Sequence, residues 1–194
     1  MQDSFLQRKL ATSCQCDRSI KGNIDEPVRP LCNYLNSHDD FFTTSSCSGR
    51  IVLFQDSCSK TKMAEHDPWL LISHEQVTFE QVSSALSVEL AGMVSFKFEP
   101  IVLHVETRTI EQAERLLKTA ISAGFRNSGI TCGPRLIVAI RCTLKLDLPI
   151  SNTRGEIMIT EDYFKMIIDL ANQKMKRNQE LIDRLFLAIQ SSIK

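Results

Sequence analysis

Hydrophobic segments of strand length occur in pairs between the predicted helices, and this arrangement constrains the fold more than any other feature. The paired segments are residues 41–46 with 50–55 and residues 94–98 with 101–106, and residues 135–146 alternate apolar and polar side chains most regularly. Paired strands between helices predict an α+β fold with a mixed or antiparallel sheet. No G-x-G-x-x-G motif follows a strand, so we do not expect a Rossmann-like fold.

Helix boundary signals place packed helices around this sheet. Residues 78–81 and 109–112 have the spacing of capping boxes, and Asp25 precedes an acidic residue and a proline as a helix N-cap would. A long C-terminal helix is predicted from about residue 160 to 193. We expect that helix to bend or to split near Asn178, because an unbroken rod would extend roughly 50 Å.

A short internal similarity is compatible with duplication. A strand, a histidine and a Thr-x-Glu-Gln helix follow one another at residues 69–90 and again at 101–123. Ser-Gly pairs also occur twice, at 48–49 and 128–129. A duplicated strand–helix unit and chance repetition both account for this pattern. Under duplication, the two histidines and the two Ser-Gly pairs would face a shared cleft.

Length, charge and cysteine usage restrict the class of protein. The 194 residues suit a single domain over residues 1–194. The 23 basic and 23 acidic residues give no overall excess of positive charge of the kind many nucleic-acid-binding domains carry, although a local basic patch could still contact phosphates. The seven cysteines show no paired metal-ligand spacing, and no apolar run reaches membrane length. We therefore expect a cytoplasmic protein with reduced thiols, no metal and no membrane association, and we favour a monomer.

The stretch from Phe41 to Arg50 offers chemistry for binding a polar ligand. It places small and hydroxylic residues and one arginine between two strand-like segments, and Gly49 permits a sharp turn or a close backbone approach. Serine hydroxyls, backbone N–H groups and a guanidinium together can hold a partly anionic ligand. A serine-rich turn that merely joins two strands is the alternative interpretation.

Several separated motifs, in this order along nearly the whole chain, resemble one known family. The family is the tRNA wybutosine-synthesising protein 3 family, which consists of S-adenosylmethionine-dependent methyltransferases. The motifs are Asp17–Asp25, Thr43–Ile51, Trp69 with His74, Phe98–Val105, Gly124–Gly129, and Tyr163 with Asn172.

The resemblance implies a specific reaction. The expected activity is methyl transfer from S-adenosylmethionine to N4 of the 7-aminocarboxypropyl-demethylwyosine intermediate, next to the anticodon of phenylalanine tRNA. The tRNA anticodon loop would then be the partner, with the target base splayed out of its stack. The alternative is a non-catalytic module that binds modified tRNA or a protein partner. A hydrolase using His74 and a serine is a weaker third hypothesis, because the sequence places no acid partner.

The candidate site residues follow from the motifs and from their chemistry. Arg50 can clamp a carboxylate through two parallel hydrogen bonds, and its alternative is a pair with a neighbouring acid. For His104 the default alternative is a hydrogen-bonded core histidine, and for Trp69 it is core packing. The candidate catalytic residues are His74 and His104; the candidate cofactor-binding residues are Ser45, Ser46, Ser48, Arg50, Ser128 and Gly129; the candidate substrate-binding residues are Lys21, Asp25, Trp69, Arg126 and Arg141.

Overall fold

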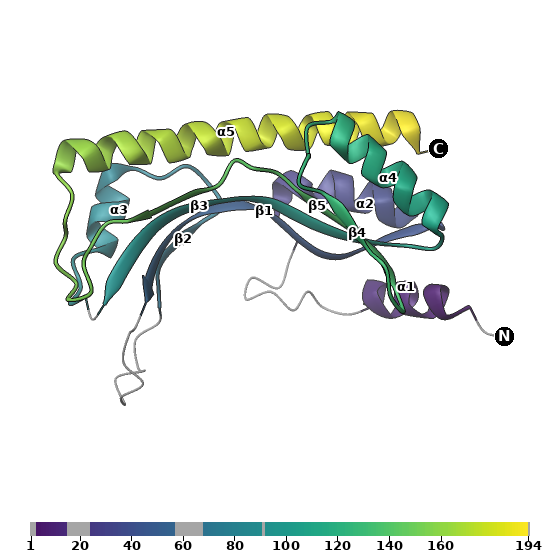
Figure 1. Ribbon diagram of the computed structural model, residues 1–194, viewed down its shortest axis with the longest axis horizontal. Helices are drawn as coiled ribbons and strands as arrows, with labels where there is room; N and C mark the ends of the chain where they lie inside the picture. The colour runs from purple at the N-terminus through teal and green to yellow at the C-terminus, as the bar shows by residue number, and fades with distance from the viewer. Residues whose placement is uncertain (1–2, 15–23, 57–67, 91, 194) are drawn as a thin grey trace. The chain divides into compact units, whose positions relative to one another are not determined.

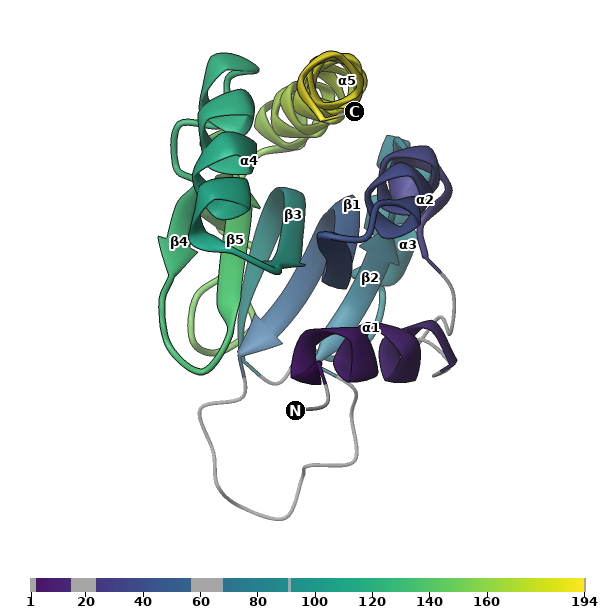
Figure 2. The same cartoon turned by 90° about the vertical axis from the view of Figure 1, so that its right-hand side faces the viewer.

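The computed structural model describes residues 3–14, 24–56, 68–90 and 92–193, and its chain forms two compact units (Figures 1 and 2). Unit 1 comprises Met1–Ser48, Ile101–Thr143 and Gln179–Lys194, and unit 2 comprises Gly49–Pro100 and Leu144–Asn178. Strands β1 and β3 and helix α5 run through both units. Lys21 lies outside the described residues.

The strands form one sheet with the order β2-β1-β3-β5-β4, and β6 also pairs with β3. The pairings of β2 with β1, of β5 and β6 with β3, and of β4 with β5 are antiparallel. This confirms the predicted α+β class and excludes a Rossmann-like parallel sheet. The strands are β1 (Phe41–Asp56), β2 (Trp69–Ser73), β3 (Met93–Thr107), β4 (Gly129–Thr131), β5 (Leu136–Arg141) and β6 (Leu146–Pro149).

The helices largely begin where the sequence predicts them. Thr78 makes the complete capping box with Gln81, whereas Thr109 caps its helix while the Gln112 side chain donates to Asp40 instead of closing the box. The helices are α1 (Ser4–Cys14), the 3-10 turn η1 (Glu26–Val28), α2 (Arg29–Ser37), α3 (Phe79–Ala85), α4 (Ile110–Ser122) and α5 (Glu161–Ser192).

The sequence predicts that the C-terminal helix bends or splits near Asn178, and of these two alternatives the split is wrong. Helix α5 is a single helix of 32 residues. Asn178 is only 1% exposed, and the boundary between the two units falls directly after it. The buried faces of the helix on both sides of this residue explain its continuity, because tertiary packing stabilises a helix more than local propensity does.

The serine-rich stretch is a strand, and the prediction of a turn there is wrong. β1 continues without interruption from Phe41 to Asp56. Gly49 adopts a φ of 105°, a conformation that glycine tolerates and that allows a local irregularity inside the strand. Hydroxylic residues are compatible with strands, so composition alone does not separate this strand from a loop.

The second expected pair of strands is also continuous. β3 includes Pro100, which lies between the two segments expected as separate strands. β6 pairs with residues 95–98 of β3 and β5 with residues 102–107. Pro100 falls between these pairings, so on that side of β3 its missing N–H removes no ladder hydrogen bond.

Residues 135–146 form parts of two strands rather than the single strand predicted. β5 ends at Arg141 and β6 begins at Leu146, and the two pair with different stretches of β3. After β6, an isolated antiparallel bridge joins Ser151 to Ile157. The alternation of apolar and polar residues therefore predicted strand structure here, but it did not predict that the chain divides into two strands, β5 and β6.

Each unit has its own apolar core. In unit 1, helices α2 and α4 lie on one face of the sheet and α1 on the other (Figure 2), where Phe5 and Phe42 pack with ring centroids 5.2 Å apart. In unit 2, α3 and the first part of α5 cover one face (Figure 1), with Phe96, Phe98 and Phe164 in the core. Phe98, which opens one of the sequence motifs, is fully buried. No helix in the described part of the chain is long and apolar enough to cross a membrane.

Candidate functional site

Several of the predicted site residues meet around His104 in unit 1. His104 lies half-buried on β3, with Nδ1 2.8 Å from Ser45 Oγ and Nε2 3.1 Å from Arg141 Nη2. The backbone N–H of Arg141 donates to Ser128 Oγ at 3.2 Å. The antiparallel pairing of β3 with β5 places His104 opposite Ala139, two residues before Arg141. Pairing of distant strands thus connects residues that the sequence proposed separately.

The hydrogen bonds of His104 define its protonation state. A guanidinium can only donate, so Nε2 accepts from Arg141 and carries no proton. The proton of the neutral ring is therefore on Nδ1, which donates to Ser45 Oγ. Burial lowers the pKa of His104 below its ordinary value of 6.5, and the positive charge of Arg141 lowers that pKa further. His104 is accordingly a neutral imidazole at pH 7 whose Nε2 lone pair is held by Arg141.

An ion pair lies further along the same strand. Glu106, two residues after His104 on β3, is 1% exposed and pairs with Arg8 of α1 at 2.7 Å. Alternate residues of a strand point to the same face, so Glu106 and His104 share one face of β3. Because Arg8 offsets the charge of Glu106, the uncompensated charge in contact with His104 is that of Arg141.

Arg50 in unit 2 already has an acidic partner. Its Nε donates to Glu99 Oε2 at 2.7 Å, and its guanidinium carbon lies 4.9 Å from the centroid of the Trp69 ring. The Trp69 ring also packs edge-on against Phe54, with centroids 4.9 Å apart. Trp69 is half-buried and lies on the second strand rather than in the unit 2 core. The alternative of an arginine paired with a neighbouring acid thus describes Arg50 in this structure.

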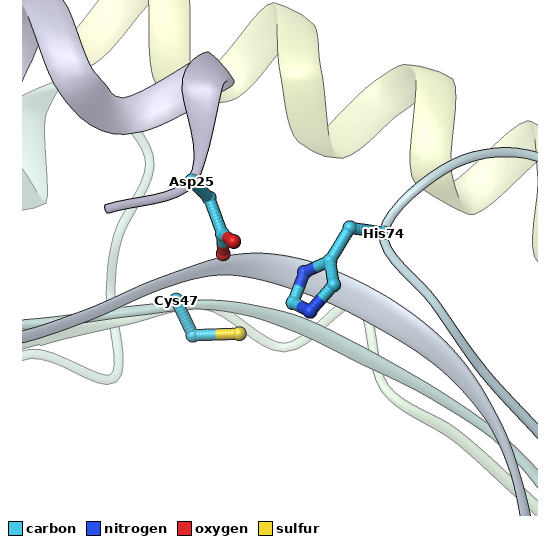
Figure 3. A group of neighbouring side chains, drawn as sticks. All are labelled: Asp25, Cys47 and His74. Carbon is cyan, nitrogen blue, oxygen red and sulfur yellow. The ribbon is translucent and has the colours of Figure 1, made fainter. Parts of the chain in front are cut away.

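His74 and Asp25 each fix the backbone of β1 (Figure 3). His74 Nδ1 lies 3.1 Å from the carbonyl oxygen of Gly49, so it is the protonated nitrogen and donates. The Asp25 carboxylate accepts the Ser48 N–H at 2.9 Å and the Ser48 hydroxyl at 3.1 Å. Asp25 is the N-cap residue of η1, as predicted, but its side chain makes no capping hydrogen bond to that turn.

The remaining hydroxyls of the serine-rich strand serve internal contacts. Ser48 is 3% exposed, and its hydroxyl is used by Asp25. Burial raises the pKa of the Cys32 thiol to about 11, although hydrogen bonds from Ser46 and Thr43 oppose this effect. These side chains hold the strand beneath α2, so Ser45 is the serine of this stretch that contacts a candidate catalytic side chain.

Two predicted residues lie apart from these contacts. Arg126 is exposed in the turn after α4, and Gly129 opens β4 opposite Ala139, with no atom within 4 Å of the position a Cβ would occupy. Glu99 was not among the predicted site residues, although it lies in a motif that the sequence singled out. Pairing of the strands that carry Arg50 and Glu99 was the missing signal.

Comparisons with known proteins identify the family of this chain. The family model described as "Methyltransferase TYW3" matches residues 3–191. A Danio rerio protein named "tRNA wybutosine-synthesizing protein 3 homolog" is 40% identical over 195 residues, covering 98% of this chain and 76% of that protein. An Arabidopsis thaliana protein named "tRNA wybutosine-synthesizing protein 2/3/4" is 37% identical and is matched over 97% of this chain but 21% of its own length.

Solved structures agree with these sequence matches. The PH1069 protein from Pyrococcus horikoshii OT3 superposes with a TM-score of 0.86 at 33% identity, covering 99% of this chain and 96% of that one. A hypothetical protein from Aeropyrum pernix, at 20% identity and a TM-score of 0.74, shares the fold.

The fold and the sequence matches define this protein as a methyltransferase with a role in wybutosine biosynthesis. More specifically, the chain belongs to the TYW3 methyltransferase family. This confirms the resemblance stated from its motifs.

Proposed function

We propose that this protein methylates N4 of the 7-aminocarboxypropyl-demethylwyosine intermediate in phenylalanine tRNA, with S-adenosylmethionine as the methyl donor. The observation that carries the proposal is the family match over residues 3–191, joined to curated relatives named for wybutosine synthesis. The match favours an enzyme over the alternative of a non-catalytic binding module. We further propose that it acts in the cytoplasm on the anticodon loop.

The donor set fits the methyl donor and the substrate. Both molecules carry an amino-acid carboxylate, and a guanidinium such as that of Arg141 or Arg50 binds carboxylates through parallel hydrogen bonds. Ser45 adds a hydroxyl next to His104. When bound, S-adenosylmethionine supplies a methyl group on a positively charged sulfur, which needs little further activation.

The residues of the chain would contribute positioning and proton transfer. His104 would accept the proton that the target nitrogen loses, because it is a neutral imidazole with a lone pair at Nε2. In unit 2, the Trp69 ring with the Arg50 guanidinium over it is a candidate surface for stacking an RNA base. His74 would keep the backbone at Gly49 in place through its hydrogen bond.

Mass spectrometry of phenylalanine tRNA tests this function. Cells that lack the protein should accumulate the nucleoside one methyl group short, and the purified protein with S-adenosylmethionine should convert that nucleoside to the methylated product. Calorimetry with S-adenosylmethionine gives an independent check of donor binding. Complete modification in cells without the protein, with no parallel enzyme, would contradict the proposal.

A further inference from the structure

Arg141 carries a charge that no acid in the described part of the chain offsets. Among the residues that the structure describes, its side chain bonds the Nε2 atom of His104, a neutral acceptor, and the residue is exposed. By contrast, Arg8 of α1 is paired with the carboxylate of Glu106. A guanidinium has five N–H donors, so a single bond to an imidazole leaves most of them for a ligand.

An anionic oxygen is a stronger partner for Arg141 than the imidazole. Bidentate bonds between a guanidinium and a carboxylate or phosphate are charge-assisted at both ends, whereas the bond to Nε2 is charge-assisted only by the donor. An anion that arrives at Arg141 therefore competes well for the same N–H groups. Its negative charge also offsets the positive charge that disfavours protonation of His104.

We propose that Arg141 is an anion receptor that releases His104 when it binds the substrate. The ligand group is an anionic oxygen, either a carboxylate or a backbone phosphate, and this inference rests on the proposed function. Binding of the anion withdraws the guanidinium from Nε2, so the lone pair becomes available only when substrate is present. Arg141 is a positioning residue in this scheme, and His104 accepts the proton.

The surroundings of His104 fit this role. From β1, Ser45 accepts from Nδ1 and the Thr44 hydroxyl donates to the His104 carbonyl oxygen at 3.3 Å. From its own strand, Glu106 is compensated by Arg8 of α1. From β5, the charged group is Arg141. Ser45 thus fixes Nδ1–H and directs proton acceptance to Nε2.

The proton and the electrons balance in the methyl transfer step. The target nitrogen forms a bond to the methyl carbon as the bond between that carbon and sulfur breaks, and the electron pair of the broken bond stays on sulfur. The nitrogen's proton passes to Nε2 of His104, which becomes an imidazolium. The imidazolium then returns the proton to solvent.

Nitrogen-15 NMR of the histidine side chains in the full chain tests the proposal. The His104 signals are assigned by their loss in His104→Gln. We expect a neutral Nδ1–H tautomer in the free protein, and an upward shift of the His104 pKa when an anion binds. Free methionine probes the carboxylate, and an unmodified anticodon stem-loop RNA probes the phosphates.

Two variants separate the receptor from a merely structural arginine. In Arg141→Gln the pKa of His104 should be raised in the free protein, and neither probe should shift it further. Arg141→Lys, which keeps the charge without the fork, should retain a reduced response. With methylated product as a second readout, kcat/KM should fall about 10²-fold in Arg141→Gln through a higher KM, because the variant loses the charge-assisted contact to the substrate anion while Nε2 of His104 stays available.

The results identify which anion Arg141 binds, or they reject the proposal. A shift with methionine identifies a carboxylate, and a shift with RNA alone identifies a phosphate. An Nε2–H tautomer in the free protein, or a pKa of His104 that ignores both probes while methylation proceeds normally, would overturn the proposal and leave the proposed function intact. Absence of methylation with a normal pKa response would instead count against the proposed function.

Discussion

Arg50 in unit 2 and Arg141 in unit 1 both contact candidate site residues, yet their charges are in opposite situations. Arg50 pairs with a carboxylate at 2.7 Å and stacks over an aromatic ring. Arg141 donates to a neutral imidazole. An anionic ligand must displace Glu99 to bind Arg50, but it needs to displace only a weaker neutral acceptor to bind Arg141. The residues around Arg50 in the sequence favoured it as the anion-binding arginine. The hydrogen bonds and ion pairs in the structure favour Arg141 instead.

The largest expected effect is the loss of activity when Arg141 is removed. Arg141→Ala should lower kcat/KM for methylation by about 10²- to 10³-fold, the usual effect of deleting one charge-stabilising donor. Because Arg141 is exposed, the free energy of unfolding should change by less than about 0.5 kcal/mol. Steady-state kinetics and denaturant titrations measure the two quantities. Arg50→Ala is the matched variant, and a larger loss in it than in Arg141→Ala would reverse the comparison.

A second prediction concerns Asp25, a carboxylate that accepts hydrogen bonds from Ser48 and is expected to contribute to stability. Asp25→Ala should destabilise unit 1 by about 1–3 kcal/mol, because it leaves the buried Ser48 donors without an acceptor. Asp25→Asn keeps an acceptor oxygen and should cost less. Urea unfolding of both variants measures the difference. Equal stabilities of wild type and Asp25→Ala would show that these hydrogen bonds contribute no net stability.

A third prediction concerns a variant in which Arg50, like Arg141, has no acidic partner among the described residues. Glu99→Gln removes the anionic partner, so the half-buried guanidinium should bind a carboxylate ligand more tightly, by roughly tenfold. Asp147→Asn is the control, because Asp147 pairs with Lys97 on the same unit and not with Arg50. Calorimetric titration with S-adenosylmethionine measures the change. Unchanged or weaker binding in Glu99→Gln alone would remove Arg50 from the anion-binding residues.

The smallest expected effect is a pH dependence of stability from His104. Its pKa is lowered in the folded protein, so below the ordinary value of 6.5 the unfolded state binds more protons and stability falls. Unfolding free energies should therefore decrease as the pH drops from about 7.5 to about 5.5. His104→Gln should remove part of that slope. Identical slopes in both proteins would mean that His104 is not held neutral.

The sequence predicted the fold class because its signals are local. Thr78 and Thr109 marked helix starts, and the alternation around Val138 and Ile140 marked a strand. The errors arose where pairing partners decide, as at Gly49 and Pro100, which lie inside strands, and at Asn178, which lies inside a helix. A glycine or proline in the sequence suggests that a strand ends, but whether the strand continues depends on the strands that pair with it.

The candidate site was predictable as a set of residues but not as contacts. Ser45, His104, Ser128 and Arg141 were each proposed, and the antiparallel pairing of β3 and β5 joins them. The tautomer of His104 and the pairing of Arg50 with Glu99 depend on side chains from distant strands, which spacing does not encode. Ser48 appeared suited to a ligand, but the buried Asp25 uses its hydroxyl.

A structure of the protein bound to S-adenosylmethionine and the anticodon stem-loop is the most direct test of the comparison between the two arginines. We predict an anionic oxygen within hydrogen-bond distance of the Arg141 guanidinium, with His104 Nε2 no longer bonded to Arg141 and facing the target nitrogen. Arg141 still donating to Nε2, with every carboxylate and phosphate held elsewhere, would contradict the account.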